Sequence, residues 1–354
     1  MAVPTLFHSH LYEQHDQAYC SQFANIEQAA ASQGEVLIGA PGSIIEHKRA
    51  GAIYYARQYM GPDGNKLEEN LGGPSGDEAV EARVERVRER IESTKSLITR
   101  IRALAKLGFQ LADNKTFATM GVLSNHGLFQ AGAVLIGSHA YAVLLNSLGI
   151  KAVSYETEDI DIARGHFLAL SNVPEGRLLE ILKETGINFV EVPPMARGMP
   201  STSFKQARAT RFHVYLLVPS SDDSFPVIAV PELNAHATGL PYLAYLLGES
   251  QMATLISRHG AVSVRVPTPG RFAIHKLLVS RLRTNMLIKS QKDVHQACVL
   301  LAAMGEHRSG DIEDACAALP KSSRQVVRRV LPEVRKLMEQ RHEGALSELE
   351  ASLA

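Results

Sequence analysis

The sequence predicts an α/β (α+β) fold with a mixed sheet, and three observations lead to this class. Short runs of β-branched and aliphatic residues alternate with amphipathic segments between residues 113 and 235. A turn-rich hairpin pattern and a long charged segment precede this region, and mostly helical patterns follow it. We therefore expect an N-terminal helix, β-hairpin and long helix over 1–110, a core over 111–237 and a C-terminal helical domain over 238–354.

The N-terminal region is expected to contain two helices separated by a hairpin. Residues 11–33 are rich in Ala and Gln and predict a helix, whereas GPDGN within 52–71 is typical of a hairpin turn. Asp77 is the expected N-cap of a helix over 78–107 that carries one apolar stripe. The arginines of this helix mostly fall on other faces. They form either a solvated surface or a groove for RNA or phosphate.

The core and C-terminal regions are expected to combine strands with helices. An acidic strand contains Asp159 and Asp161, and 190–208, rich in Pro, Gly and Ser, predicts a loop. The other expected strands are 117–124, 132–138, 211–219 and 225–233, the last two joined by SSDDS. The other expected helices are 139–149, 176–187, 240–258, 270–288, 291–305 and 322–340.

Bulk composition narrows the class of protein. The 354 residues carry 37 basic and 37 acidic side chains, so net charge gives no argument for nucleic acid or a membrane surface. The N-terminus lacks a basic segment followed by an apolar one, and no run of 18 apolar residues occurs, so we expect neither a signal peptide nor a membrane span. Three widely spaced cysteines fit a reducing cytoplasm. The oligomeric state is left open.

The candidate functional residues are a small-residue turn and a pair of aspartates. Strand side chains alternate, so Asp159 and Asp161 are expected on one face, with Ile160 and Ile162 on the other. Two adjacent carboxylates repel one another unless a cation lies between them, and Mg²⁺ prefers such oxygen ligands together with phosphate oxygens. Gly137 and Ser138 open the helix that precedes this strand, where free backbone N–H groups favour phosphate.

These residues resemble a known signature. Gly137-Ser138 followed by Asp159-Ile160-Asp161 is similar to the Gly-Ser turn and acid–apolar–acid strand of the DNA polymerase β nucleotidyltransferase superfamily. The segment 266–301, with its His-Lys and Lys-Asp-x-x-Gln-Ala elements, resembles bacterial nucleotidyltransferase domain proteins, to which AbiEii-type toxins are distantly related. The resemblance covers roughly residues 50–305.

The resemblance implies a polymerase β-like core that moves a nucleoside monophosphate from a nucleoside triphosphate to a hydroxyl on RNA, protein or a small molecule. Gly137 and Ser138 would bind the triphosphate, and Asp159 and Asp161 would be catalytic and hold one or two Mg²⁺ ions. Lys276, Lys289, Lys292 and Asp293 would lie in C-terminal helices that close over the cleft, where a lysine would neutralise phosphate.

The superfamily's third carboxylate is missing from its expected place. The matching strand has Tyr215 there, and a neutral phenol is a poor magnesium ligand and a poor base. His213 on the same strand face is a candidate base, and Glu232, Asp222 or Asp223 are candidate substitutes. Two alternatives to an active transferase follow: a nucleotide-binding regulatory module with weak or no turnover, and a toxin-like modifier of tRNA or protein.

Overall fold

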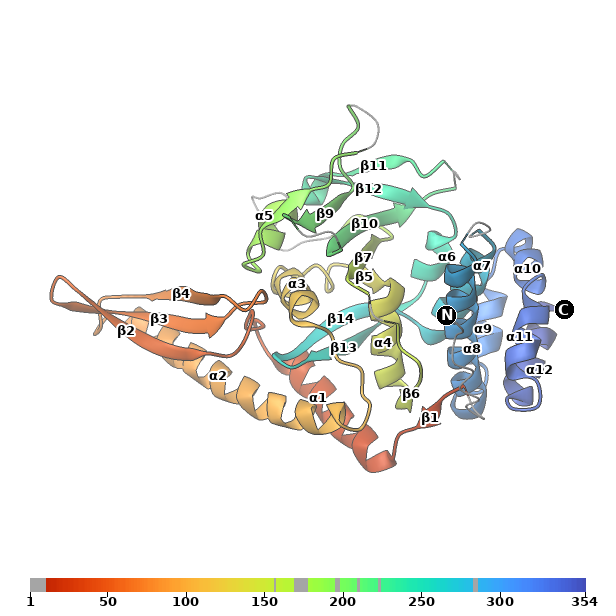
Figure 1. Ribbon diagram of the computed structural model, residues 1–354, viewed down its shortest axis with the longest axis horizontal. Helices are drawn as coiled ribbons and strands as arrows, with labels where there is room; N and C mark the ends of the chain where they lie inside the picture. The colour runs from red at the N-terminus through yellow and green to blue at the C-terminus, as the bar shows by residue number, and fades with distance from the viewer. Residues whose placement is uncertain are drawn as a thin grey trace.

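The computed structural model describes residues 11–155, 157–168, 178–194, 198–208, 211–221, 224–282 and 286–354. Figure 1 shows an elongated molecule in which a three-stranded sheet and a long helix project from one end. A mixed sheet lies in the middle, and a group of helices forms the other end. The expected α/β (α+β) class with a mixed sheet, an N-terminal hairpin-plus-helix region and a C-terminal helical region is therefore confirmed.

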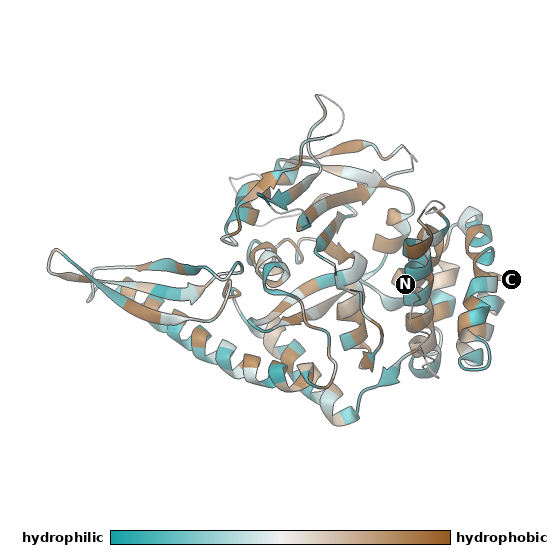
Figure 2. Ribbon diagram, viewed as in Figure 1, coloured by the Kyte–Doolittle hydropathy of each residue, from teal (hydrophilic) through white to brown (hydrophobic). Residues whose placement is uncertain are grey.

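The projecting arm forms from the predicted hairpin and long helix. β3 (Ala52–Met60) and β4 (Lys66–Gly72) make the hairpin, and β2 (Ser43–Arg49) adds a third antiparallel strand. Its sheet packs on α2 (Glu78–Ala105), whose first turn is capped by the Asp77 carboxylate as predicted. Apolar and polar residues alternate along α2 in Figure 2, because one stripe faces the sheet and α1 (Gln17–Ser32).

The basic residues of α2 are largely compensated by acids. Ion pairs join them to glutamates of α2 itself, of β4 and of the segment before β2, namely Arg88–Glu85, Lys95–Glu92, Arg83–Glu69 and Arg90–Glu35. These pairs are mostly exposed, so they stabilise little, but they cancel positive charge locally. The helix thus presents a mixed, solvated surface, which does not favour an arginine-lined groove for RNA.

The central sheet has the strand order β11-β12-β10-β7-β5. β7 (Asp159–Arg164), β10 (His213–Pro219) and β12 (Ala235–Leu240) are parallel, whereas β5 (Ala133–Ile136) and β11 (Val227–Val230) pair antiparallel at the two ends. The predicted strands 211–219 and 225–233 are therefore present, but β12 lies between them. Residues 222 and 223 lie outside the described residues.

The predicted loop over 190–208 is wrong in part. β9 (Ser203–Gln206) pairs with the start of β10, and β8 (Phe189–Glu191) pairs with β9. Pro, Gly and Ser residues in the intervening segment hid these short strands, because turn-forming residues dominate any local pattern. Before them, α5 (Leu178–Lys183) confirms a helix within 176–187.

The strand predicted over 117–124 is wrong, because α3 (Asn114–Asn125) occupies this segment. Its N-terminus is capped by Asp113, whose carboxylate accepts hydrogen bonds from the amides of Lys115 and Thr116. Every residue from Thr116 to Leu123 is buried, so the sequence lacks the helical alternation of apolar and polar faces. α4 (Gly137–Ser147), by contrast, confirms the helix predicted over 139–149.

The helix predicted over 240–258 is also wrong. Only α6 (Leu243–Leu247) is helical there, and it is followed by a hairpin of β13 (Ser250–Ser257) and β14 (Gly260–Pro267). A two-residue turn at Arg258-His259 fixes the register of the hairpin. The residues from Ala253 to Ser257 are all buried, so both faces of β13 are covered and the strand lacks alternation.

The C-terminal helices follow the predicted order with two breaks. Most of the predicted helix 270–288 is α7 (Pro269–Leu282), and residues 283–285 lie outside the described part. The next helix, α8 (Leu287–His307), includes the predicted helix 291–305. The predicted helix 322–340 is two helices, because Pro332 cannot donate the hydrogen bond that would continue the first. The remaining helices are α9 (Asp311–Ala317), α10 (Lys321–Arg328), α11 (Leu331–Met338) and α12 (Glu343–Leu353).

One buried apolar cluster joins the central sheet to the C-terminal helices. It runs from α3, β5 and α4 through β7 and β10 to α7, α8 and α12. β12 also continues the sheet across residue 237, where the sequence predicted a boundary. The division of the chain at 110 and 237 stays a prediction. No helix in the described ranges combines the length and apolar character needed to cross a lipid bilayer.

Candidate functional site

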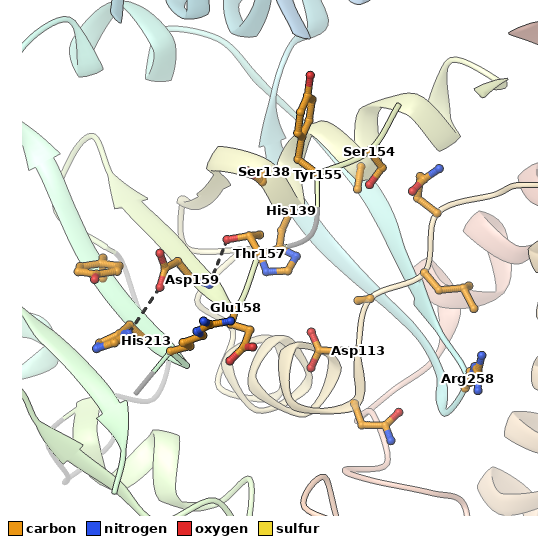
Figure 3. Close-up of a pocket in the computed structure, with 17 residues that line it drawn as sticks. Asp113, Ser138, His139, Ser154, Tyr155, Thr157, Glu158, Asp159, His213 and Arg258 are labelled. Carbon is orange, nitrogen blue, oxygen red and sulfur yellow. Dashed lines mark hydrogen bonds and ion pairs between the residues drawn. The ribbon is translucent and has the colours of Figure 1, made fainter. Parts of the chain in front are cut away.

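A cleft of about 1020 Å³ lies at the ends of β5, β7 and β10. It is bounded by the first turn of α4, the segment before β7, the start of β10, the residues that lead into α3, and the β13–β14 turn. Figure 3 shows Asp159 and His213 on one side, His139 near the middle and Arg258 at the far side. The lining residues with polar or charged side chains are Gln110, Asp113, Asn114, Ser138, His139, Ser154, Tyr155, Thr157, Glu158, Asp159, Arg211, His213, Tyr215 and Arg258.

Position 137 requires glycine, because the Asp161 carboxylate occupies the space that a side chain there would need. The antiparallel register of β5 and β7 places Ile136 opposite Asp161, so the turn at Gly137 meets that carboxylate. Gly137 has φ +72°, a left-handed conformation, and a Cβ atom built on it would lie 2.2 Å from Asp161 Oδ2. The glycine therefore lets a carboxylate approach the N-terminus of α4.

Asp159 lies on the same strand face as Asp161 and borders the cleft. Its side chain is half exposed, and Thr157 Oγ1 accepts a hydrogen bond from its backbone amide at 3.2 Å. The parallel register of β7 and β10 puts His213 beside it, with Nδ1 3.5 Å from Asp159 Oδ1 (Figure 3). Asp159 and the predicted candidate base His213 thus lie on one side of the cleft, whereas Asp161 lies further along β7, against Gly137, and is not among the lining residues.

Tyr215 is the direct neighbour of Asp161 on β10. Its ring stacks with that of His213 at a centroid distance of 5.7 Å. Burial, and then the charges of Asp159 and Asp161, raise the pKa of the Tyr215 hydroxyl, so it stays neutral near pH 7. The place beside Asp161 where a third carboxylate was expected therefore holds an uncharged phenol.

Glu232 does not replace that carboxylate. It is buried, forms an ion pair with Arg164 at the opposite end of β7, and accepts a hydrogen bond from the backbone amide of Leu168. Its pKa is lowered although burial acts to raise it, because these partners favour the charged form. The other two proposed substitutes, Asp222 and Asp223, lie outside the described residues.

The three candidate lysines occupy different environments. Lys292 Nζ on α8 donates a hydrogen bond to Ser138 Oγ at 2.9 Å and lies over the Tyr155 ring at 4.8 Å. Lys276 instead forms a buried ion pair with Asp293 at 2.8 Å and does not line the cleft. Lys289 is exposed on the first turn of α8. Lys292 is thus the lysine that the fold brings to the Gly137-Ser138 turn.

His139 was not among the residues singled out from the sequence. It directly follows Ser138 on the first turn of α4, is 9% exposed, and lines the cleft. Burial lowers the pKa of its imidazole, which keeps the ring neutral at pH 7. Its place immediately after a predicted phosphate-binding turn is the signal that would have identified it.

The described residues contain no group of three or more His, Cys, Asp or Glu side chains arranged to hold a metal ion. Asp159 and Asp161 offer two carboxylates on one strand face, with phenol and imidazole beside them. Mg²⁺ in nucleotide sites commonly uses one or two carboxylates and completes its shell with phosphate oxygens and water. This donor set is chemically suited to such an ion and contains no cysteine thiolate.

Comparison with known families identifies the family of the chain. A family model described as nucleotidyltransferase matches residues 114–320, which is more than half of the chain. The chain belongs to this nucleotidyltransferase family. The matched range begins at α3 and contains the Gly137-Ser138 turn, both β7 aspartates, β10 and α8. The expected membership of a nucleotidyltransferase family is confirmed, whereas the kinship with AbiEii-type toxins is not.

Comparisons with individual proteins add little to the family assignment. No curated protein sequence matches the chain. Among solved structures, an antigenic nucleotidyltransferase-like protein from Paracoccidioides brasiliensis is similar over 63% of this chain and 92% of its own. The sequence identity is 15% and the TM-score is 0.31, so this likeness does not inform the site.

Replacing Gly137 by Ala should weaken Mg²⁺–triphosphate binding at least about tenfold, because the new methyl group would displace the Asp161 carboxylate. Titration calorimetry with a non-hydrolysable nucleoside triphosphate measures this change. Gly127→Ala is the matched control. Gly127 has φ +73° and nothing within 4 Å of a built Cβ. An alanine there therefore introduces backbone strain without a steric clash. Equal losses in the two variants would show that strain, not the contact with Asp161, is responsible.

Proposed function

We propose that this protein transfers a nucleoside monophosphate from a nucleoside triphosphate to an acceptor hydroxyl, with release of pyrophosphate, and depends on Mg²⁺. One observation carries the proposal. The Asp161 carboxylate lies against Gly137 at the N-terminus of α4, beside the Ser138–Lys292 contact. The carboxylates that would hold the metal and the turn that would hold the phosphates are therefore adjacent, and Asp159 and Ser138 line the cleft. Membership of the nucleotidyltransferase family supports the same reaction class.

The phosphate side of the site uses backbone and cationic groups. Ser138 and the free amides of the first turn of α4 are suited to donate hydrogen bonds to phosphate oxygens, and the helix dipole adds to their attraction. Lys292, held at Ser138 by a hydrogen bond, brings a positive charge from α8 to the same turn. These groups would orient the triphosphate and balance the charge of the departing pyrophosphate.

The carboxylate side would hold the metal. Asp159 and Asp161 would bind Mg²⁺, with one or two ions accommodated according to how many ligands the substrates provide. When bound, Mg²⁺ neutralises phosphate charge and polarises the phosphoryl group. Thr157 positions the strand backbone at Asp159, and the Gly137 contact positions Asp161. The cleft volume of about 1020 Å³ is at the upper end of the range for small-molecule sites, which leaves room for an acceptor beside the nucleotide.

The test is transfer of a labelled nucleotide. The purified protein is incubated with each α-³²P nucleoside triphosphate, Mg²⁺ and three acceptor pools: total RNA, soluble protein and small metabolites. Label should enter one pool and pyrophosphate should be released, and removal of Mg²⁺ with EDTA should stop both. Absence of transfer from all four nucleotides to all three pools would refute the proposal.

A second candidate function is nucleotide binding without turnover, and Tyr215 is the observation that favours it. The neutral phenol beside Asp161 takes the place of a third carboxylate, which would help to hold metal and to deprotonate the acceptor. Such a module would bind Mg²⁺–triphosphate in calorimetry yet transfer no label in the assay above. Modification of tRNA or protein by a toxin-like activity has no comparable support, since four of the basic residues of α2 form ion pairs with glutamates, namely Arg83, Arg88, Arg90 and Lys95.

A further inference from the structure

His139 is a buried side chain whose Nε2 atom has no hydrogen-bond partner among the described residues. Only 9% of its surface is exposed, and its Nε2 atom makes no hydrogen bond within the described part of the chain. Buried polar groups in folded proteins nearly always have hydrogen-bond partners, and an unsatisfied one costs stability. Figure 3 shows the ring between Thr157 and the middle of the cleft. The group that satisfies this imidazole is therefore expected to come from a ligand in the cleft.

The surroundings of His139 indicate the chemistry of that ligand. The residue lies in the first turn of α4, next to Ser138 and its hydrogen bond with Lys292. The charges of Asp113, Asp159 and Lys292 all act on its imidazole, so it lies between the carboxylate side and the phosphate side of the cleft. A neutral imidazole has one N–H donor, which it can offer to an anionic oxygen without itself carrying charge.

We propose that His139 binds the triphosphate, donating its imidazole N–H to a phosphate oxygen held at the N-terminus of α4. This inference rests on the proposed function, because it takes the cleft to be the nucleotide site. The inference adds His139 to the proposed phosphate-binding residues Gly137, Ser138 and Lys292, and assigns His139 a hydrogen-bonding role. A hydrogen bond to a charged oxygen in a water-poor site is stronger than one between neutral groups.

The test uses inorganic tripolyphosphate with Mg²⁺, which has no sugar or base, and a non-hydrolysable nucleoside triphosphate in parallel. Titration calorimetry at pH 7.5 should show that His139→Leu binds both probes roughly tenfold to a hundredfold more weakly than the wild type. His139→Gln keeps an amide donor at this position and should recover part of the loss. Thermal unfolding of each variant checks that the fold is retained.

His15 provides a matched control. It is also 9% exposed, its Nε2 atom is also without a hydrogen bond in the described residues, and burial also lowers its pKa. It stacks on Phe109 at a centroid distance of 4.1 Å and does not line the cleft. His15→Leu should therefore leave the affinity for both probes within about twofold of the wild type.

Three results would overturn the inference. Normal binding of tripolyphosphate by His139→Leu, together with a loss of affinity for the nucleotide, would assign the imidazole to the sugar or base. Normal binding of both probes by His139→Leu would also contradict the inference, as would a loss of affinity in His15→Leu equal to that in His139→Leu. The proposed function is judged separately. If the wild type binds both probes and His139→Leu does not, the inference holds even where the labelled-nucleotide assay finds no transfer.

Discussion

Replacing Asp161 by Asn is expected to lower nucleotidyl transfer about 10³-fold while the protein stays folded. The amide has nearly the same shape as the carboxylate, so it should fit against Gly137 without the clash that a larger side chain would cause. It lacks the negative charge that would hold Mg²⁺ in the cleft. A bound metal contributes several kcal/mol to stabilising a phosphoryl transition state, and each 1.36 kcal/mol is a factor of ten in rate. The measurement is kcat/KM for label transfer at saturating Mg²⁺.

Glu158→Gln is the control for this substitution. Glu158 also lines the cleft and precedes Asp159 directly, but it lies outside β7, the strand that carries the two aspartates. Removal of its charge should change transfer no more than about threefold. A similar loss in both variants would mean that net negative charge in the cleft matters, rather than a metal bound at Asp161. Full activity in Asp161→Asn would contradict the metal assignment.

Replacing Lys276 by Met is expected to lower the free energy of unfolding by about 3–5 kcal/mol. Lys276 and Asp293 form a buried ion pair between α7 and α8, with side chains 9% and 1% exposed. Removing the ammonium group leaves the Asp293 carboxylate buried without its lysine partner, which is costly at low dielectric. Denaturant unfolding monitored by circular dichroism measures the change. Affinity for Mg²⁺–triphosphate should stay within about twofold, because the Lys276 ammonium group is held by the buried Asp293 carboxylate.

Two further variants serve as the control and the rescue for Lys276→Met. Lys289 is exposed on α8, so its substitution should alter stability by less than about 0.5 kcal/mol. Lys276→Met combined with Asp293→Leu should recover much of the loss, since no buried charge remains. If Lys276→Met instead kept its stability and lost affinity for triphosphate, Lys276 would be a nucleotide-binding residue, as the sequence resemblance implied.

Local sequence signals predicted the elements that depend on short-range chemistry. The N-cap at Asp77, the β3–β4 hairpin and the acidic strand of β7 are all as expected, because caps, turns and alternation are encoded within a few residues. Predictions failed where a segment is buried on every side. α3 and β13 lack the alternation that distinguishes a helix from a strand, so packing, not periodicity, sets their conformation.

The residues of the candidate site also fall into two groups: those that local sequence patterns predicted, and those that only tertiary packing places. Sequence spacing pointed to Gly137, Ser138, Asp159 and Asp161, because a turn and a strand each carry a local pattern. It did not distinguish Lys292 from Lys276, since both are lysines on helices. Only the tertiary structure brings Lys292 on α8 to Ser138 on α4, and only the packing of α7 against α8 pairs Lys276 with Asp293.

By itself, the sequence determined that this chain has a small-residue turn and two carboxylates on one face of a strand. It also determined that the turn opens a helix. The tertiary structure decided which groups meet. Strand register set Asp161 against Gly137, Tyr215 beside Asp161 and His213 beside Asp159. Burial lowered the pKa of His139, and packing left its Nε2 atom without a hydrogen bond among the described residues. Contacts between residues distant in sequence depend on the register and packing of whole elements, and no local pattern encodes these.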